Sequence, residues 1–405
     1  MEKTALNLKS IFALPKPVFI LGIVSLFMDM SSEMIVPLMP IFLNDLLQAS
    51  KLSIGLIEGV AESTASILKV ISGWFSDKIG RRKPLIFWGY SLSVLSRPLL
   101  AGATSWIGVL IYRFTDRLGK GIRTSPRDAL IADVTEGIHM GRAFGFHRAM
   151  DTLGAVIGPA IAFSVLALSS NNMRLVFWLS MIPGGFAIAT IALFVKDVII
   201  KKSEVRSQKK DFSLKNIDGG FKRFLFIAVL FTLGKIPEAF LLLRAKELGV
   251  NLKVIPIVYL LFNITTAVLA TPSGIIADKI GKRKIIFLSY IVAGITFLGF
   301  ALSNNSLYAW LLFIIYGLFV AMNEGNQRAF VASLINPEKK GTGYGIYHTM
   351  VGLSALPGGL ISGYLYQLKG SLIVFLYGAF ISIISAFIFY ILLMRDIPDS
   401  NKGGS

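Results

Sequence analysis

Apolar runs long enough to cross a lipid bilayer recur about every 30 residues along the whole chain. The 405 residues leave room for about 12 runs of roughly 20 residues each, joined by short loops. Hydrophobic residues make up 54% of the chain, as in membrane proteins that cross the bilayer many times. The pattern therefore predicts an all-α membrane protein with about 12 transmembrane helices.

The predicted helices form two groups of six, separated by one polar stretch. This stretch, 196–220, is rich in Lys, Ser and Asp, and we expect it to be a flexible cytoplasmic linker. The expected domains are an N-terminal bundle at 1–195 and a C-terminal bundle at 221–396, followed by a tail at 397–405 whose Gly-Gly-Ser end is typical of an added linker. The predicted spans are Val18–Leu43, Leu52–Ser76, Pro84–Ala103, Trp106–Val134, Arg142–Leu168, Met173–Val195, Phe221–Leu243, Val254–Ala277, Ile285–Leu302, Leu307–Leu334, Gly341–Leu368 and Leu372–Met394.

The two groups repeat one another in sequence. GWFSDKIGRRK at 73–83 matches GIIADKIGKRK at 274–284, which begins 201 residues later. GRAFGFHRAMDTLGAVIG at 141–158 matches GTGYGIYHTMVGLSALPG at 341–358, which begins 200 residues later. Two independent landmarks at nearly one offset indicate a duplicated six-helix unit. In parallel repeats of this kind, ligands bind near the membrane midplane between the halves.

Basic residues gather in the loops on one side of the predicted helices. The net charge of +18 would suggest nucleic-acid binding in a soluble protein, but these loops account for most of it. Cytoplasmic loops are enriched in Lys and Arg. We therefore expect a multi-pass protein of the bacterial inner (plasma) membrane, with both termini cytoplasmic and no nucleic-acid partner. Because the chain has no cysteine, we expect no thiolate metal site, and we predict neither a metal nor a cofactor.

The fourth predicted span carries a charged face. Unpaired charges facing lipid cost about 2.5–3.5 kcal/mol each, so this face must meet protein or a water-filled cavity. It is either the wall of a polar path or a frame of buried ion pairs. The residues of this face fall within roughly 120° on a helix, and they are Arg113, Asp116, Arg117, Lys120, Arg123 and Arg127.

Carboxylates also lie inside other predicted spans. Asp29 and Glu33 are four residues apart on one face of the first span, near its middle. In the fifth span, Asp151 is within reach of His147 and Arg148 on one face. Desolvated carboxylates beside a basic helix are candidates for carrying protons.

The loops at 73–83 and 274–284 resemble the signature loop of the major facilitator superfamily, and the resemblance covers the whole chain. It implies two pseudo-symmetric six-helix bundles that work by alternating access. The run DRLGKGIRTSPRDALIAD at 116–133 is similar to a poorly characterised bacterial subgroup of that superfamily.

The resemblance also implies a gating latch at the cytoplasmic face. In it, Asp77 would pair with Arg81 and with the N-terminus of the eleventh helix, and Asp278 would mirror it against the fifth helix. The alternative is that the basic residues of these loops only set the topology. The predicted latch residues are Gly73, Asp77, Arg81, Asp278 and Arg283.

In this superfamily the first, fourth, seventh and tenth helices line the cavity, which implies candidate site residues on each. The predicted substrate-binding residues are Arg117, Lys120, Arg123, Lys235, Asn323 and Gln327. The predicted proton-coupling residues are Asp29, Glu33, Asp116, Asp151 and Glu324. For Glu324, a structural pair with Arg328 is the alternative.

These features predict a secondary transporter of a small organic anion, because the planar guanidinium group of arginine suits carboxylates and phosphates. The carboxylates inside the spans predict coupling to protons. Carboxylate siderophores, organic acids and phosphorylated metabolites are the candidate classes. The alternative is a proton-driven exporter of amphipathic drugs or cations, with a carboxylate as the cation ligand.

A membrane sensor would need a soluble output domain, which the linker does not provide. Because Walker, HExxH and GxSxG motifs are absent from the sequence, we predict neither an enzyme nor ATP drive. We expect a monomer in the lipid bilayer.

Overall fold

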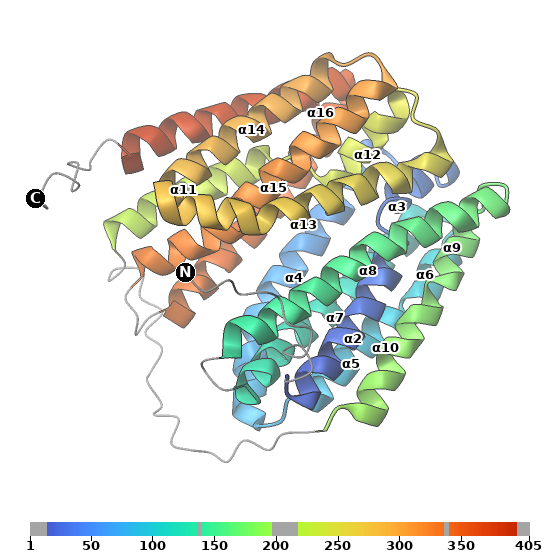
Figure 1. Ribbon diagram of the computed structural model, residues 1–405. Coiled ribbons are helices and arrows are strands. Elements are labelled where there is room, and N and C mark those ends of the chain that lie inside the picture. The colour runs from blue at the N-terminus through green and yellow to red at the C-terminus, as the bar shows by residue number, and fades with distance from the viewer. Residues whose placement is uncertain (1–13, 136–138, 197–217, 336–339, 395–405) are drawn as a thin grey trace, which may run out of the picture. The chain divides into compact units, whose positions relative to one another are not determined.

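The computed structural model describes residues 14–135, 139–196, 218–335 and 340–394, and the regular elements in these ranges are all helices (Figure 1). The expected linker and tail lie almost entirely outside these ranges. The chain divides into two compact units. Unit 1 comprises residues 1–42 and 64–206, and unit 2 comprises residues 43–63 and 207–405.

Several predicted spans of unit 1 are interrupted near prolines. The first span ends at Glu33 instead of continuing to Leu43, because Pro37 and Pro40 lack the N–H that a continuous helix needs. The third and sixth spans are each divided into two helices. The helices of unit 1 are α2 (Lys16–Glu33), α3 (Met39–Ile41), the second part of α4 (Lys51–Ile79), α5 (Lys83–Leu95), α6 (Arg97–Ala101), α7 (Trp106–Asp133), α8 (Met140–Leu168), α9 (Met173–Leu179) and α10 (Met181–Phe194).

Glycines allow the helices of unit 1 to approach one another backbone to backbone. A Cβ atom on Gly119 of α7 would lie 2.4 Å from the carbonyl oxygen of Gly89 on α5. A Cβ atom on Gly154 of α8 would lie 2.5 Å from the carbonyl oxygen of Leu26 on α2. These distances leave no room for a side chain, so α5–α7 and α2–α8 are tightly packed pairs.

Unit 2 contains the second copy of the repeat. Its seventh predicted span is divided at Pro237, as expected for an internal proline. Its last two predicted spans form one long element that is broken at Gly370, where φ is 77°. The helices of unit 2 are the first part of α4 with η1 (Phe42–Leu46), α11 (Gly219–Gly234), α12 (Glu238–Glu247), η4 (Leu252–Val254), α13 (Ile255–Ile280), α14 (Lys282–Leu302), α15 (Ser306–Leu334), α16 (Lys340–Phe389) and η6 (Tyr390–Met394).

Residues 43–63 belong to unit 2, although the sequence-based N-terminal bundle included them. The reason is a seam of glycines along α4 and α16. A Cβ atom on Gly55 would lie 2.1 Å from the carbonyl oxygen of Gly359, and one on Gly363 would lie 2.5 Å from that of Lys51. A salt bridge between Lys246 and Asp45 adds a charged contact within the same unit.

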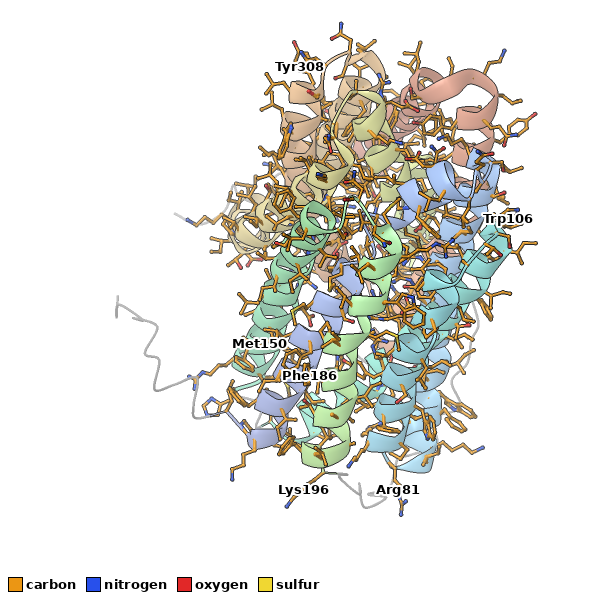
Figure 2. All side chains as sticks on the ribbon, turned by 90° about the vertical axis from the view of Figure 1, so that its right-hand side faces the viewer. Arg81, Trp106, Met150, Phe186, Lys196 and Tyr308 are labelled. Carbon is orange, nitrogen blue, oxygen red and sulfur yellow. The ribbon has the colours of Figure 1, made fainter. Side chains whose placement is uncertain are left out.

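Seven helices in the described ranges are long and apolar enough to cross a membrane. Two of them belong to unit 1 and five to unit 2. Helix α7 is not among them, because its charged face lowers its hydropathy. Large apolar side chains such as Leu168 (90% exposed) and Leu193 (75% exposed) face outward, as lipid-facing residues do. In unit 1, Arg81 and Lys196 lie at one end and Trp106 at the other (Figure 2).

Candidate functional site

A polar cavity of about 40 Å³ lies inside unit 1, between the end of α2 and the middle of α7. A space of this size holds a few water molecules or one small charged group. Its wall contains three carboxylates and four cations. The lining residues are Asp29, Ser32, Glu33, Val36, Tyr112, Arg113, Asp116, Arg117, Lys120 and Arg123.

Two of the charged residues on α7 are held by neighbouring side chains. Arg123 is 5% exposed, donates a 2.6 Å hydrogen bond to Ser93 Oγ, and lies 4.4 Å from the centre of the Tyr90 ring. The Arg117 guanidinium Nε lies 3.6 Å from Asp116 Oδ2, which is an ion-pair distance. Arg123 therefore has structural partners on α5, and Arg117 is partly neutralised by its neighbour.

Lys120 differs from these arginines. Its side chain is exposed, and it makes no hydrogen bond or salt bridge within the part of the chain that the structure describes. Arg117 and Lys69 both interact with it electrostatically, as does Asp29 from α2. The cavity thus holds a group of neighbouring cations around one free ammonium.

On the opposite wall, Asp29 and Glu33 both line the cavity, and they share one helix face, as their spacing predicted. Asp151 is not a lining residue. It lies on α8, where its Oδ1 accepts a hydrogen bond from Ser25 of α2, and it interacts electrostatically with Asp29. Of the predicted proton-coupling residues, Asp29, Glu33 and Asp116 therefore meet at one cavity and Asp151 lies behind it.

A buried arginine, Arg97, lies behind the cavity wall, within the third predicted span, and was not a predicted site residue. Arg97 is 1% exposed and donates a 2.6 Å hydrogen bond to the Ser180 carbonyl oxygen. It also donates to Ser32 Oγ at 3.4 Å. The Ser180 carbonyl lies at the break between α9 and α10 and also accepts from Ser31. The sequence signal was a charged residue next to Pro98 inside an apolar span.

The predicted binding residues of unit 2 have neutral partners within that unit. Asn323 Oδ1 accepts a hydrogen bond from Ser289 at 3.3 Å. The Gln327 amide bridges two tyrosines, donating to Tyr290 at 3.0 Å and accepting from Tyr347 at 2.6 Å.

The remaining candidates of unit 2 are charged. Glu324 pairs with Arg328 at 3.9 Å, and both side chains are about half exposed (49% and 62%), so this contact is weak. Lys235 stands at the break between α11 and α12.

On the charged face of α7 in unit 1, Arg127 was not a predicted site residue, and it pairs with Asp128 at 2.9 Å.

At the signature loop of unit 1, Asp77 pairs with Arg82 at 2.6 Å, whereas Arg81 is exposed. Arg82 also lies 3.2 Å from Asp133 at the end of α7. The partner of Asp77 in this structure is thus Arg82, which is buried, and not the exposed Arg81. A Cβ atom on Gly73 would lie 3.4 Å from Ser125, so that glycine is not tightly packed.

The corresponding loop of unit 2 has different contacts. Asp278 is exposed. Arg283, which stands 201 residues after Arg82, donates to the Leu393 carbonyl oxygen at 3.0 Å and lies 5.7 Å from the Phe330 ring centre.

Known proteins resemble this chain over most of its length. An uncharacterized MFS-type transporter of Methanocaldococcus jannaschii is 37% identical over 382 residues, covering 92% of this chain and 94% of the relative. A probable 4-methylmuconolactone transporter of Cupriavidus pinatubonensis is 27% identical over 68% of this chain and 69% of the relative. A class H tetracycline resistance protein of Pasteurella multocida is 21% identical over 87% of this chain and 89% of the relative.

Among solved structures, a variant of the nucleoside transporter NupG superposes with a TM-score of 0.79 over 93% of this chain and all of the other, at 15% identity, which supports the fold. The profile described as Major Facilitator Superfamily matches residues 21–243 and 224–404. These family matches over both halves, together with a relative 37% identical along nearly its whole length, show that the chain belongs to the major facilitator superfamily of membrane transporters.

Proposed function

We propose that the chain is a secondary active transporter that moves a small organic anion by alternating access and couples this movement to protons. The observation that carries the proposal is the cation group around Lys120. Neighbouring like charges repel one another, so an anion bound beside Lys120 relieves the repulsion from Arg117 and Lys69. A carboxylate or phosphate supplies that charge and accepts hydrogen bonds from both kinds of side chain.

The same geometry supplies a reason for proton coupling. Ionised Asp29 interacts with Lys120 and therefore competes with an anionic substrate for it. A proton on Asp29 leaves Lys120 available to the substrate, and release of that proton restores the attraction between Asp29 and Lys120. Binding of the anion and binding of the proton thus favour each other, as reciprocal linkage requires.

A ligand-stabilisation screen on the purified protein tests the proposal. Citrate, glycerol 3-phosphate and 4-methylmuconolactone are compared with the lipophilic cation tetraphenylphosphonium, because a ligand at 100 times its Kd stabilises by about 2.7 kcal/mol. We expect an anion to raise the melting temperature, with affinity reduced about tenfold in Lys120→Gln. Lys196→Gln removes the same charge from an exposed position of unit 1 and is the matched control.

The second candidate function is a proton-driven exporter of amphipathic drugs or cations. It is favoured by the two carboxylates, Asp29 and Glu33, in the cavity wall and by the similarity to a tetracycline resistance protein. Stabilisation by tetraphenylphosphonium alone, retained in Lys120→Gln and lost in Asp29→Asn, would replace the anion proposal with this one.

The topology is part of the proposal. Arg81 and Lys196 lie at the same end of unit 1, which supports a cytoplasmic position for that end (Figure 2). We place both termini on the cytoplasmic side of a bacterial inner membrane, with the monomer as the working form. A reporter fused after Asn401 that is active on the outer side of the membrane would overturn this orientation.

A further inference from the structure

Behind the cavity, α8 carries a histidine and a carboxylate one turn apart. His147 is 4% exposed, and its Nδ1 lies 3.6 Å from Asp151 Oδ2, within ion-pair reach but beyond a hydrogen bond. The other oxygen of Asp151 accepts from Ser25. His147 Nε2 is buried and has no hydrogen-bond partner in the ranges that the structure describes.

Close helix packing connects this pair to the cavity. Gly154, one turn after Asp151, lies against α2 so closely that a Cβ atom there would be 3.0 Å from Asp29 Cβ. A Cβ atom on Gly158 would lie 2.9 Å from Glu33 Cβ. Asp151 therefore faces the same stretch of α2 that supplies the two carboxylates of the cavity, and it interacts electrostatically with Asp29.

The charged groups that act on His147 lie on its own helix and on α7. Asp151 and Arg148 belong to α8 itself, and Arg127 and Asp128 belong to α7. The two carboxylates favour an imidazolium and the two guanidinium groups oppose it. Asp151 also interacts electrostatically with Asp29, so a change of charge on Asp29 in the cavity wall reaches His147 through Asp151.

The second copy of the repeat shows what a structural residue does at this position. Tyr347 stands 200 residues after His147, and its hydroxyl donates a 2.6 Å hydrogen bond to Gln327. Val351 stands 200 residues after Asp151 and has no charge. A neutral, hydrogen-bonded residue therefore fits the position, whereas His147 leaves a buried nitrogen without a hydrogen-bond partner, which is unfavourable in a structural residue.

We propose that His147 and Asp151 together bind the exchangeable proton of unit 1, and that Asp29 passes it between this pair and the cavity. The inference rests on the proposed proton coupling and identifies its site. In the protonated state the imidazolium is paired with Asp151. In the deprotonated state neutral His147 leaves Asp151 ionised, beside Ser25.

The first test measures the proton site directly, without a substrate. The chain has three histidines, His139, His147 and His348, so ¹⁵N-histidine NMR of the whole protein in lipid nanodiscs gives a small set of signals. We expect the His147 signal to titrate with pH, and Asp151→Asn to lower its midpoint by about one unit, a tenfold loss of proton affinity. His139, exposed at the start of the same helix, should be unaffected.

A His147 signal that does not titrate in the wild-type protein, or whose midpoint is the same in Asp151→Asn, overturns the proposal. The wild-type titration decides the question even where the variant does not fold.

The second test uses proteoliposomes and an internal pH dye, with a mixture of citrate, glycerol 3-phosphate and 4-methylmuconolactone as the probe. His147→Gln should reduce anion-dependent proton entry about tenfold while exchange of labelled anion continues, and His139→Gln should change neither. Anion-dependent proton entry that persists in His147→Gln contradicts the proton site. Absence of any anion transport by the wild type contradicts the proposed function, and the NMR titration then decides the proton site by itself.

Discussion

In unit 1 the buried polar side chains include charged ones, whereas in unit 2 the buried polar side chains of the described residues are neutral. Arg97, Arg113, Asp116 and Arg123 are each at most 7% exposed. The buried polar side chains described in unit 2 are serines, Thr296 and the amides Asn323, Asn326 and Gln327. In the described ranges, five helices of unit 2 are long and apolar enough to cross a membrane, compared with two helices of unit 1. Among the described residues, fully buried charged side chains therefore occur in unit 1 and not in unit 2.

The core of unit 2 is built from aromatic rings instead. Phe231 stacks on Tyr290 at 4.1 Å, and Phe224 packs edge-on against Phe330 at 5.0 Å between ring centres. Such pairs contribute about 0.5–1.5 kcal/mol beyond the burial of their area. The two units thus share one fold but differ in their interior contacts, which include buried charged groups in unit 1 and aromatic packing in unit 2. Buried charges stabilise little by themselves, and their concentration in unit 1 therefore points to function.

The largest expected effect on this comparison comes from removing a buried charge of unit 1. Arg123→Met loses a charge-assisted hydrogen bond to Ser93 and a cation–π contact with Tyr90, so the protein should be destabilised by about 3 kcal/mol. Thermal unfolding in detergent measures this. A variant as stable as the wild type would mean that the charged frame does not support unit 1.

The glycine contacts predict the next effect. Gly119→Ala places a methyl group 2.4 Å from the Gly89 carbonyl oxygen, so the α5–α7 pair should separate at a cost of about 1–3 kcal/mol. Gly185→Ala on α10 is the control, because no atom lies within 4 Å of its Cβ position. Equal melting temperatures for the two variants would contradict the tight packing of α5 on α7.

In unit 2, Gln327→Met should cost less than the charge removal in unit 1. The change leaves the hydroxyls of Tyr290 and Tyr347 without their shared amide, which costs about 1–2 kcal/mol. We expect unchanged anion affinity in the ligand screen, because both ends of the amide are already hydrogen-bonded to these tyrosines. Reduced affinity at unchanged stability would make Gln327 a binding residue, as its position on the tenth span first indicated.

The smallest expected effect on stability concerns the signature loop. Arg82→Gln removes ion pairs to Asp77, whose side chain is 62% exposed, and to Asp133, so the loss should be below about 1 kcal/mol. Arg81→Gln should be neutral. If the loop acts as the predicted latch, Arg82→Gln should still alter the transport rate and the accessibility of the protein to labelling from the periplasmic side. Unchanged rate and labelling would reduce the loop to a topology signal.

The sequence determined the features that depend on neighbours along the chain. The apolar runs predicted where the helices lie. The last two predicted spans are separated at Gly370, and the seventh is divided at Pro237. Helical periodicity also put Asp29 and Glu33 on one face of a helix, because residues four apart share a face, and in the structure that face lines the cavity.

Tertiary packing decided which partner each charged or small residue has. Two adjacent arginines are equivalent in a sequence pattern, but only Arg82 is directed inward to Asp77 and Asp133. The carbonyl that Arg97 binds lies 83 residues away at a helix break, and the glycines that hold α4 on α16 are about 300 residues apart. Periodicity describes one helix at a time, whereas a partner is set by the distance of closest approach between helices, and that distance exists only in the folded chain.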